Sequence, residues 1–145
     1  MERERHRLVA DVAILAADEV LLVRYRDVRR YDGQRGWFVP DDYLAEREDP
    51  GDAARRIARE QLGIELSNVR LVYVESFGDG LWHIVFHYAV EMPALPLVTT
   101  GANVLEHAWF GRAKLPPPGE TAHEGWTLEI VQRALEVESD DAVRR

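Results

Sequence analysis

The sequence contains no cysteine, and none of its apolar runs is long enough to cross a bilayer. Without cysteine, the chain has neither a disulfide framework nor a thiolate metal site. The charged first segment, MERERHRLVADV, lacks the apolar stretch of a signal peptide. We therefore expect a cytoplasmic protein with no membrane partner.

Basic residues are also in deficit, because 18 Lys and Arg stand against 26 Asp and Glu, giving a net charge of −8. This balance argues against broad binding to the phosphate backbone of nucleic acid. It still permits a small anionic ligand in a local basic pocket. The sequence has no glycine-rich P-loop, no GxSxG and no HExxH, so other residues must carry any chemistry.

The 145 residues, 46% hydrophobic and 30% charged, suffice for one domain with a proper core. We place that domain at residues 1–137 and expect a flexible tail at 138–145. Apolar segments predict strands at 8–16, 20–25, 37–39, 69–74, 82–90 and 106–110. We expect helices at 52–62, after a cap at Asp49 or Asp52, and at 123–136. This order predicts a layered α/β (α+β) fold.

Residues 37–64, WFVPDDYLAEREDPGDAARRIAREQLGI, combine a strand end, an acidic loop and a helix that Gly63 ends. Residues 42–64 resemble a degenerate Nudix box, G-x5-E-x7-R-E-U-x-E-E-x-G-U, where U is a bulky apolar residue. The spacing is complete, and the matching residues are Glu48, Arg56, Glu60, Gly63 and Ile64. Several residues that carry the chemistry depart from the motif: Asp42 replaces its first Gly, Ile57 the Glu after the Arg, and Gln61 the last Glu.

The resemblance extends over nearly the whole chain and implies a Nudix fold, a mixed β-sheet sandwiched between α-helices. It implies hydrolysis of a nucleoside diphosphate linked to another moiety, with Mg²⁺ or Mn²⁺ on the box helix. It also makes a homodimer the expected assembly. Glu48, Arg56 and Gly63 are expected to support the geometry of the box.

Positions 57, 60 and 61 share one helix face, where three carboxylates could hold metal ions against a pyrophosphate. Here isoleucine cannot bind a metal, and the amide oxygen of Gln61 is a weaker ligand than a carboxylate. We expect Ile57 to widen the apolar face of the helix. Glu60, Gln61 and the backbone carbonyl near Asp41 remain as ligands for a single ion, with Glu60 as the main catalytic residue. The first hypothesis is therefore a weak or atypical metal-dependent hydrolase of a small nucleotide derivative.

Two alternatives remain open. GDP-mannose mannosyl hydrolases also carry a degenerate box, use one metal and take a histidine base from a loop near the C-terminus. His123, followed by Glu124, is the matching general-base candidate here, although the Glu retained in that group aligns with Gln61. The second hypothesis is thus a GDP-sugar glycosyl hydrolase. The third is an inactive Nudix domain that binds a nucleotide-like ligand or a protein and has no cofactor.

Several other side chains are open to two interpretations. Arg24 and Arg35, in an arginine-rich segment, can bind substrate phosphates or form a solvated edge. His83 and His87 share one strand parity and predict either a metal pair or packed strand histidines. The strand aromatics can stack on a nucleobase or fill the core: Trp37, Tyr73, Phe77 and Trp82.

Overall fold

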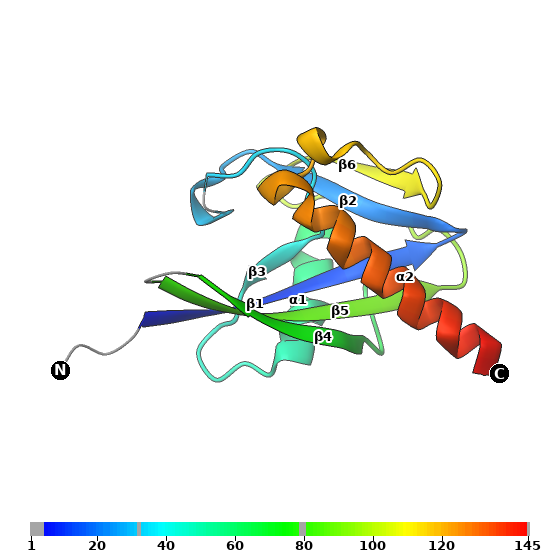
Figure 1. The fold of residues 1–145 in the computed structure, drawn as a ribbon, viewed down its shortest axis with the longest axis horizontal. Helices are drawn as coiled ribbons and strands as arrows, with labels where there is room; N and C mark the ends of the chain where they lie inside the picture. The colour runs from blue at the N-terminus through cyan, green and yellow to red at the C-terminus, as the bar shows by residue number, and fades with distance from the viewer. Residues whose placement is uncertain (1–4, 32, 79–80, 145) are drawn as a thin grey trace.

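The computed structural model describes residues 5–31, 33–78 and 81–144, which form two helices around one mixed sheet (Figure 1). The strands are β1 (Arg5–Ala16), β2 (Glu19–Tyr25), β3 (Asp41–Tyr43), β4 (Arg70–Phe77), β5 (Leu81–Met92) and β6 (Val104–Gly111). The helices are α1 (Pro50–Leu62) and α2 (Trp126–Arg144), with 3-10 turns η1 (Arg29–Tyr31), η2 (Pro118–Glu120) and η3 (Ala122–Gly125).

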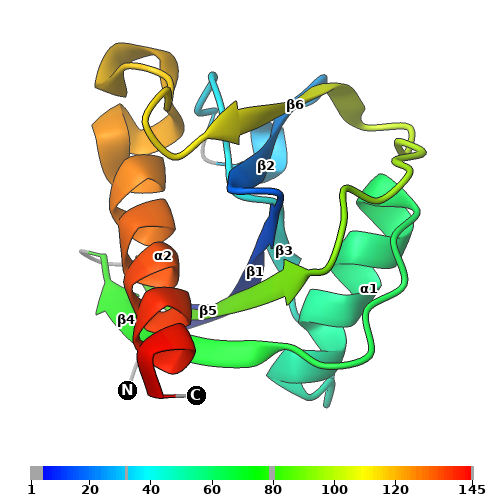
Figure 2. The same cartoon turned by 90° about the vertical axis from the view of Figure 1, so that its right-hand side faces the viewer.

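Strand β1 organises the sheet, whose order is β4-β5-β1-β2-β6 with β3 also paired to β1. It runs parallel to β5 over its whole length and antiparallel to β2 and β3 over short stretches of its other edge. Helices α1 and α2 cover opposite faces of the sheet (Figure 2). The expected mixed sheet between helices is confirmed.

The burial of β1 follows from its apolar sequence on both faces. Ala10, Val12 and Ile14 pack in the core beneath α1, whereas Ala13 and Leu15 pack in the core beneath α2. A strand covered on both faces has to be apolar at successive positions, as the sequence indicated.

Helix α1 forms where the sequence predicts it, with two clear end signals. The Asp49 carboxylate accepts hydrogen bonds from the backbone N–H groups of Gly51 and Asp52, which places Pro50 in the first turn. The helix therefore begins two residues before the expected Asp52. Gly63 ends it in the left-handed conformation, at φ 66°.

The segment after the first hairpin differs from the expectation. Residues 37–39 form isolated bridges, Phe38 to Val23 and Trp37 to Thr121, rather than a strand of their own. The strand lies just after Pro40, where Asp41–Tyr43 pairs with Val9–Asp11 of β1. The sequence analysis did not predict β3, because two of its three residues are aspartates and acidic residues are uncommon in strands.

The last helix begins and ends later than predicted. His123 lies in η3 with a φ of 53°, and Gly125 has a φ of 100°, so α2 starts only at Trp126. Helix α2 continues to Arg144, through most of the segment 138–145 for which a flexible tail was expected. No Gly or Pro follows Gly125 to interrupt it. In the described part of the chain, no helix is long and apolar enough to span a membrane.

Candidate functional site

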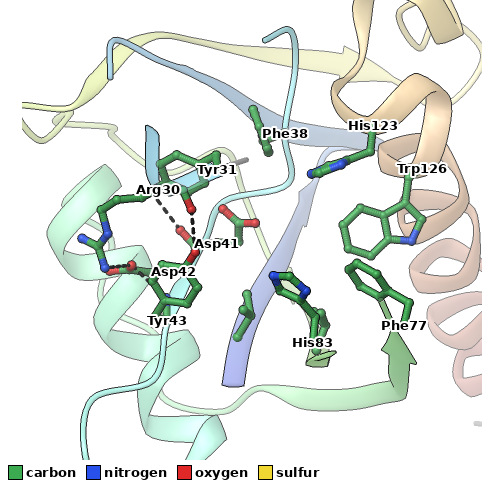
Figure 3. Close-up of a pocket in the computed structure, with 12 residues that line it drawn as sticks. Arg30, Tyr31, Phe38, Asp41, Asp42, Tyr43, Phe77, His83, His123 and Trp126 are labelled. Atoms are coloured by element: carbon green, nitrogen blue, oxygen red, sulfur yellow. Dashed lines mark hydrogen bonds and ion pairs between the residues drawn. The ribbon is translucent and has the colours of Figure 1, made fainter. Parts of the chain in front are cut away.

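A cavity of about 420 Å³, including its open mouth, lies between the sheet, the Asp41–Tyr43 strand and the start of α2 (Figure 3). Aromatic rings make up most of its lining: Tyr31, Phe38, Tyr43, Phe77, His83, His123 and Trp126. Asp41, Asp42 and Arg30 lie on one side of it, and His123 and Trp126 lie on the other. The cavity therefore combines an aromatic wall with a polar one.

Behind the polar wall, Gln61 of the box helix is held in a closed ring of hydrogen bonds. The Asp41 backbone N–H donates to the Tyr25 hydroxyl at 3.1 Å, and that hydroxyl donates to Gln61 Oε1 at 2.8 Å. Gln61 Nε2 then donates to the Asp41 carbonyl oxygen at 2.8 Å. Two expected metal ligands are thus hydrogen-bonded to each other.

The phenols of Tyr25 and Tyr31 complete this buried cluster, stacked with ring centroids 4.0 Å apart. Burial, reinforced by the charge of Asp41, raises the pKa of both hydroxyls. Both groups therefore stay protonated and remain hydrogen-bond donors. That protonation state is what the Gln61 ring requires.

Arg56 joins the acidic residues of the box. Its guanidinium binds both Glu48 oxygens, at 2.8 and 3.0 Å, and the Tyr43 carbonyl at 2.9 Å. It also contacts Asp42 at 3.2 Å and Glu60 at 3.3 Å. Hydrogen bonding to Arg56 lowers the pKa of Glu48. The contacts of Glu48 and Arg56 thus tie the acidic loop to the helix.

The two remaining positions of the box face lie away from the cavity. Ile57 is fully buried in the core beneath α1, as expected from its apolar side chain. The Glu60 side chain is 58% exposed and contacts Arg56. Neither residue lines the cavity. Across the described ranges, no group of three or more His, Asp or Glu residues is placed to hold a metal ion.

His123 is the expected general-base candidate that does reach the cavity. Its backbone N–H donates to Gln34 Oε1 at 3.0 Å, and its ring packs edge-on against Phe38 and Trp126. Figure 3 shows the imidazole pointing toward the side that carries Asp41. The side chain of Glu124 lies outside the described part of the structure.

The two arginines expected to bind substrate do not line the cavity. Arg24 forms an ion pair with Glu106 at 2.5 Å, and Arg35 is exposed. Arg30, from the same arginine-rich segment, lines the cavity and binds Asp42 at 2.7 Å. The composition of the segment could not indicate which arginine would turn inward.

The two strand histidines occupy different surroundings and do not form a metal pair. His87 is buried between two carboxylates, with Nδ1 2.6 Å from Asp11 and Nε2 2.9 Å from Glu75. Burial lowers the pKa of His87, but the charges of Asp11 and Glu75 outweigh it and the net shift is upward. Glu75 also accepts a hydrogen bond from the Trp126 indole at 3.1 Å. His87 therefore connects the sheet to the start of α2, whereas His83 lines the cavity.

Sequence reasoning missed part of the cavity lining. Tyr31, Phe38 and Trp126 carried no motif, although Phe38 lies in the WFVPDD segment that the box resemblance had already singled out. The parity of His83 on its strand was a usable signal, but it could not separate a cavity position from a packed one.

Comparison with solved structures finds the same fold in several proteins. A MutT NUDIX hydrolase from Burkholderia pseudomallei aligns at a TM-score of 0.73 with 21% identity, over 90% of this chain and 98% of that one. A MutT/nudix family protein from Enterococcus faecalis gives 0.66 and 23%, over 76% of this chain. The alignment spans 45% of the Enterococcus chain.

A third structure is a bifunctional NMN adenylyltransferase/ADP ribose pyrophosphatase from Francisella tularensis, complexed with AMP and a manganese ion. Its TM-score is 0.66 with 14% identity, over 90% of this chain and 42% of that one. The family model of the NUDIX domain matches residues 5–130. The chain therefore belongs to the NUDIX domain family.

Proposed function

We propose that this protein binds a small nucleotide derivative in the aromatic cavity and does not hydrolyse it through a multi-metal Nudix site. The observation that carries the proposal is the ring formed by Gln61, Tyr25 and Asp41. In this ring an amide N–H group of Gln61 points at the Asp41 carbonyl oxygen. A ligand set for a cation needs oxygen lone pairs directed at the ion.

Nudix hydrolases generally use divalent metals, but the residues of this box do not fit such a site. Ile57 is aliphatic and fully buried, and Gln61 donates to the carbonyl that would be its fellow ligand. Glu60, the remaining carboxylate of that face, is largely exposed and paired with Arg56. We therefore assign no step of a reaction to a metal held by the box.

A nucleotide derivative is the ligand class that the family acts on, and the cavity suits one. Tyr31, Phe38 and Trp126 offer rings to a planar group. Arg30, which lines the cavity beside Asp42, can bind a phosphate group of the ligand.

The proposal is tested by titration calorimetry with ADP-ribose, diadenosine tetraphosphate and GDP-mannose, each with Mg²⁺, with Mn²⁺ and with chelator. Product release is followed in the same samples. We expect at least one compound to bind in the absence of metal. We expect no metal-dependent turnover of any compound. Trp126→Phe should weaken binding, whereas Trp82→Phe, which changes a tryptophan outside the cavity lining, should not. The absence of binding to every compound would contradict the proposal.

Hydrolysis remains the second candidate, because His123 faces the Asp41 side across the cavity. A histidine in that place can take a proton from an attacking water. Turnover that is lost in His123→Ala would favour this candidate, and the products would show whether phosphorus or a sugar carbon had been attacked. Sensitivity of that turnover to chelator and to Glu60→Gln would restore a metal role for the box. The homodimer and the cytoplasmic location remain predictions. Light scattering would measure the oligomeric state.

A further inference from the structure

Two histidines on the same face of β5, His83 and His87, differ in the hydrogen bonding of their ring nitrogens. His87 has a carboxylate within hydrogen-bond distance of each ring nitrogen. For His83, four residues earlier, neither Nδ1 nor Nε2 has a hydrogen-bond partner within the described residues, although both atoms are shielded from solvent. Native proteins rarely leave buried polar atoms unsatisfied, so such atoms call for an explanation.

The position of His83 supplies that explanation. Its ring stacks on Phe77, with centroids 5.1 Å apart and planes 6° apart, and lines the cavity together with Trp126 (Figure 3). Stacking fixes the plane of the imidazole without satisfying its nitrogens. The ring therefore borders the cavity, and a ligand there reaches the two nitrogens by displacing the side chains that shield them.

We propose that His83 is a specificity-determining residue that hydrogen-bonds the base of the bound nucleotide derivative, a planar nitrogen-rich ring. The proposal rests on the proposed function and adds which part of the ligand enters the aromatic end of the cavity. A neutral imidazole offers one N–H donor and one acceptor nitrogen. The edge of a nucleobase carries groups of both kinds, and its face can pack against the aromatic wall.

Other ligand parts suit this end of the cavity less well. Phosphate groups would find no arginine in the described lining at this end, because Arg30 lies on the side of the cavity that carries Asp42. A metal ion would need further ligands beside the imidazole, and the described residues contain no such cluster. Phe77 and Val85 are the neighbours of His83 in the lining, and they offer packing alone. An aromatic ring with polar edges meets these surroundings best.

The test uses calorimetry on the full chain with ADP, GDP, CDP and UDP, beside ribose 5-phosphate and pyrophosphate, which lack a base. We expect at least one nucleoside diphosphate to bind about tenfold or more tightly than the probes without a base. His83→Phe keeps the stacked ring and removes both nitrogens. It should weaken that binding by about tenfold and reduce the differences among the four bases.

His107→Phe is the matched control, because His107 is exposed on β6, away from the cavity lining. The melting temperature of His83→Phe should equal or exceed that of the wild type, since no hydrogen bond within the described protein is lost. In long-range ¹H–¹⁵N spectra, the His83 nitrogens should shift on addition of the preferred nucleotide. A merely structural histidine would not show that shift.

Three results would overturn the inference. Equal affinity of His83→Phe and wild type for every nucleotide would remove His83 from recognition but leave the proposed function intact. Binding of pyrophosphate as tight as that of the best nucleotide would show that the base is not what the cavity recognises. Absence of binding by the wild type to these nucleotides and to the larger derivatives alike would overturn the proposed function as well.

Discussion

Replacing Gln61 by glutamate restores the last acidic residue of the box and tests why it is absent here. In the wild type, Gln61 Nε2 donates to the Asp41 carbonyl at 2.8 Å while Oε1 accepts from Tyr25 at 2.8 Å. Glutamate keeps the acceptor that Tyr25 needs but places a second oxygen against the carbonyl. Two acceptors then face each other in a partly buried site.

The magnitude follows from these contacts. Loss of one neutral hydrogen bond costs about 1 kcal/mol, and an unpaired buried acceptor adds about 1–3 kcal/mol. The Tyr25 hydroxyl offsets part of this loss, because a hydrogen bond to a charged group is stronger by about 1 kcal/mol. We expect Gln61→Glu to lower the free energy of unfolding by about 2 kcal/mol, or the melting temperature by about 4–8 °C.

The assay is thermal unfolding with and without Mg²⁺ or Mn²⁺. A carboxylate beside the Asp41 carbonyl can share a cation with it, so metal should raise the melting temperature of Gln61→Glu and leave the wild type unchanged. Lower pH should also reduce the difference in melting temperature between Gln61→Glu and the wild type, because a protonated glutamate regains a donor for the Asp41 carbonyl. Gln132→Glu, an exposed change of the same kind on α2, is the control.

Two outcomes would refute this reasoning. Stabilisation of the wild type by Mg²⁺ and its reversal by chelator would show that the Gln61 ring opens to admit a cation. A Gln61→Glu variant as stable as the wild type without metal would show that the ring contributes nothing.

Three further predictions concern stability and are measured by urea unfolding. Ile57→Glu should lose about 3–5 kcal/mol, because it buries an unpaired charge at a fully buried position, and an unchanged midpoint would contradict that burial. Gly63→Ala should lose about 1–2 kcal/mol, since φ is 66° and an added Cβ would lie 3.0 Å from Thr99 Cβ; no loss would mean that the helix end relaxes freely. His87 has a folded pKa above its ordinary 6.5, so its contribution is complete below pH 6.5 and is lost as the pH rises through the folded value. The raised pKa of Asp11 likewise lowers stability as the pH rises above 3.8. His87→Gln should therefore flatten the decline of stability above pH 6.5. An unchanged slope would show that the decline does not come from His87.

The box helix was predictable because its signals are local. The cap, the proline and the glycine of α1 act through neighbouring backbone groups, and the spacing of apolar residues places Ile57 inward whatever surrounds the helix. The later start of α2 was not visible, since it depends on the left-handed His123 and on Gly125. The short strand β3 was not visible either, since it is defined by its pairing with Val9–Asp11 of β1, about 30 residues earlier.

The role of Gln61 shows where local reasoning stops. The sequence says that a neutral amide stands at an acidic position, and from that alone a weaker metal ligand was the natural expectation. Its actual orientation depends on Tyr25, 36 residues earlier, whose hydroxyl accepts from the Asp41 N–H and donates to Gln61 Oε1 at 2.8 Å. With Oε1 so occupied, Nε2 has to face the Asp41 carbonyl. The same change from Glu to Gln would leave a metal ligand in a box without that tyrosine, so Tyr25→Phe should free the amide to rotate and partly restore the expected chemistry of Gln61.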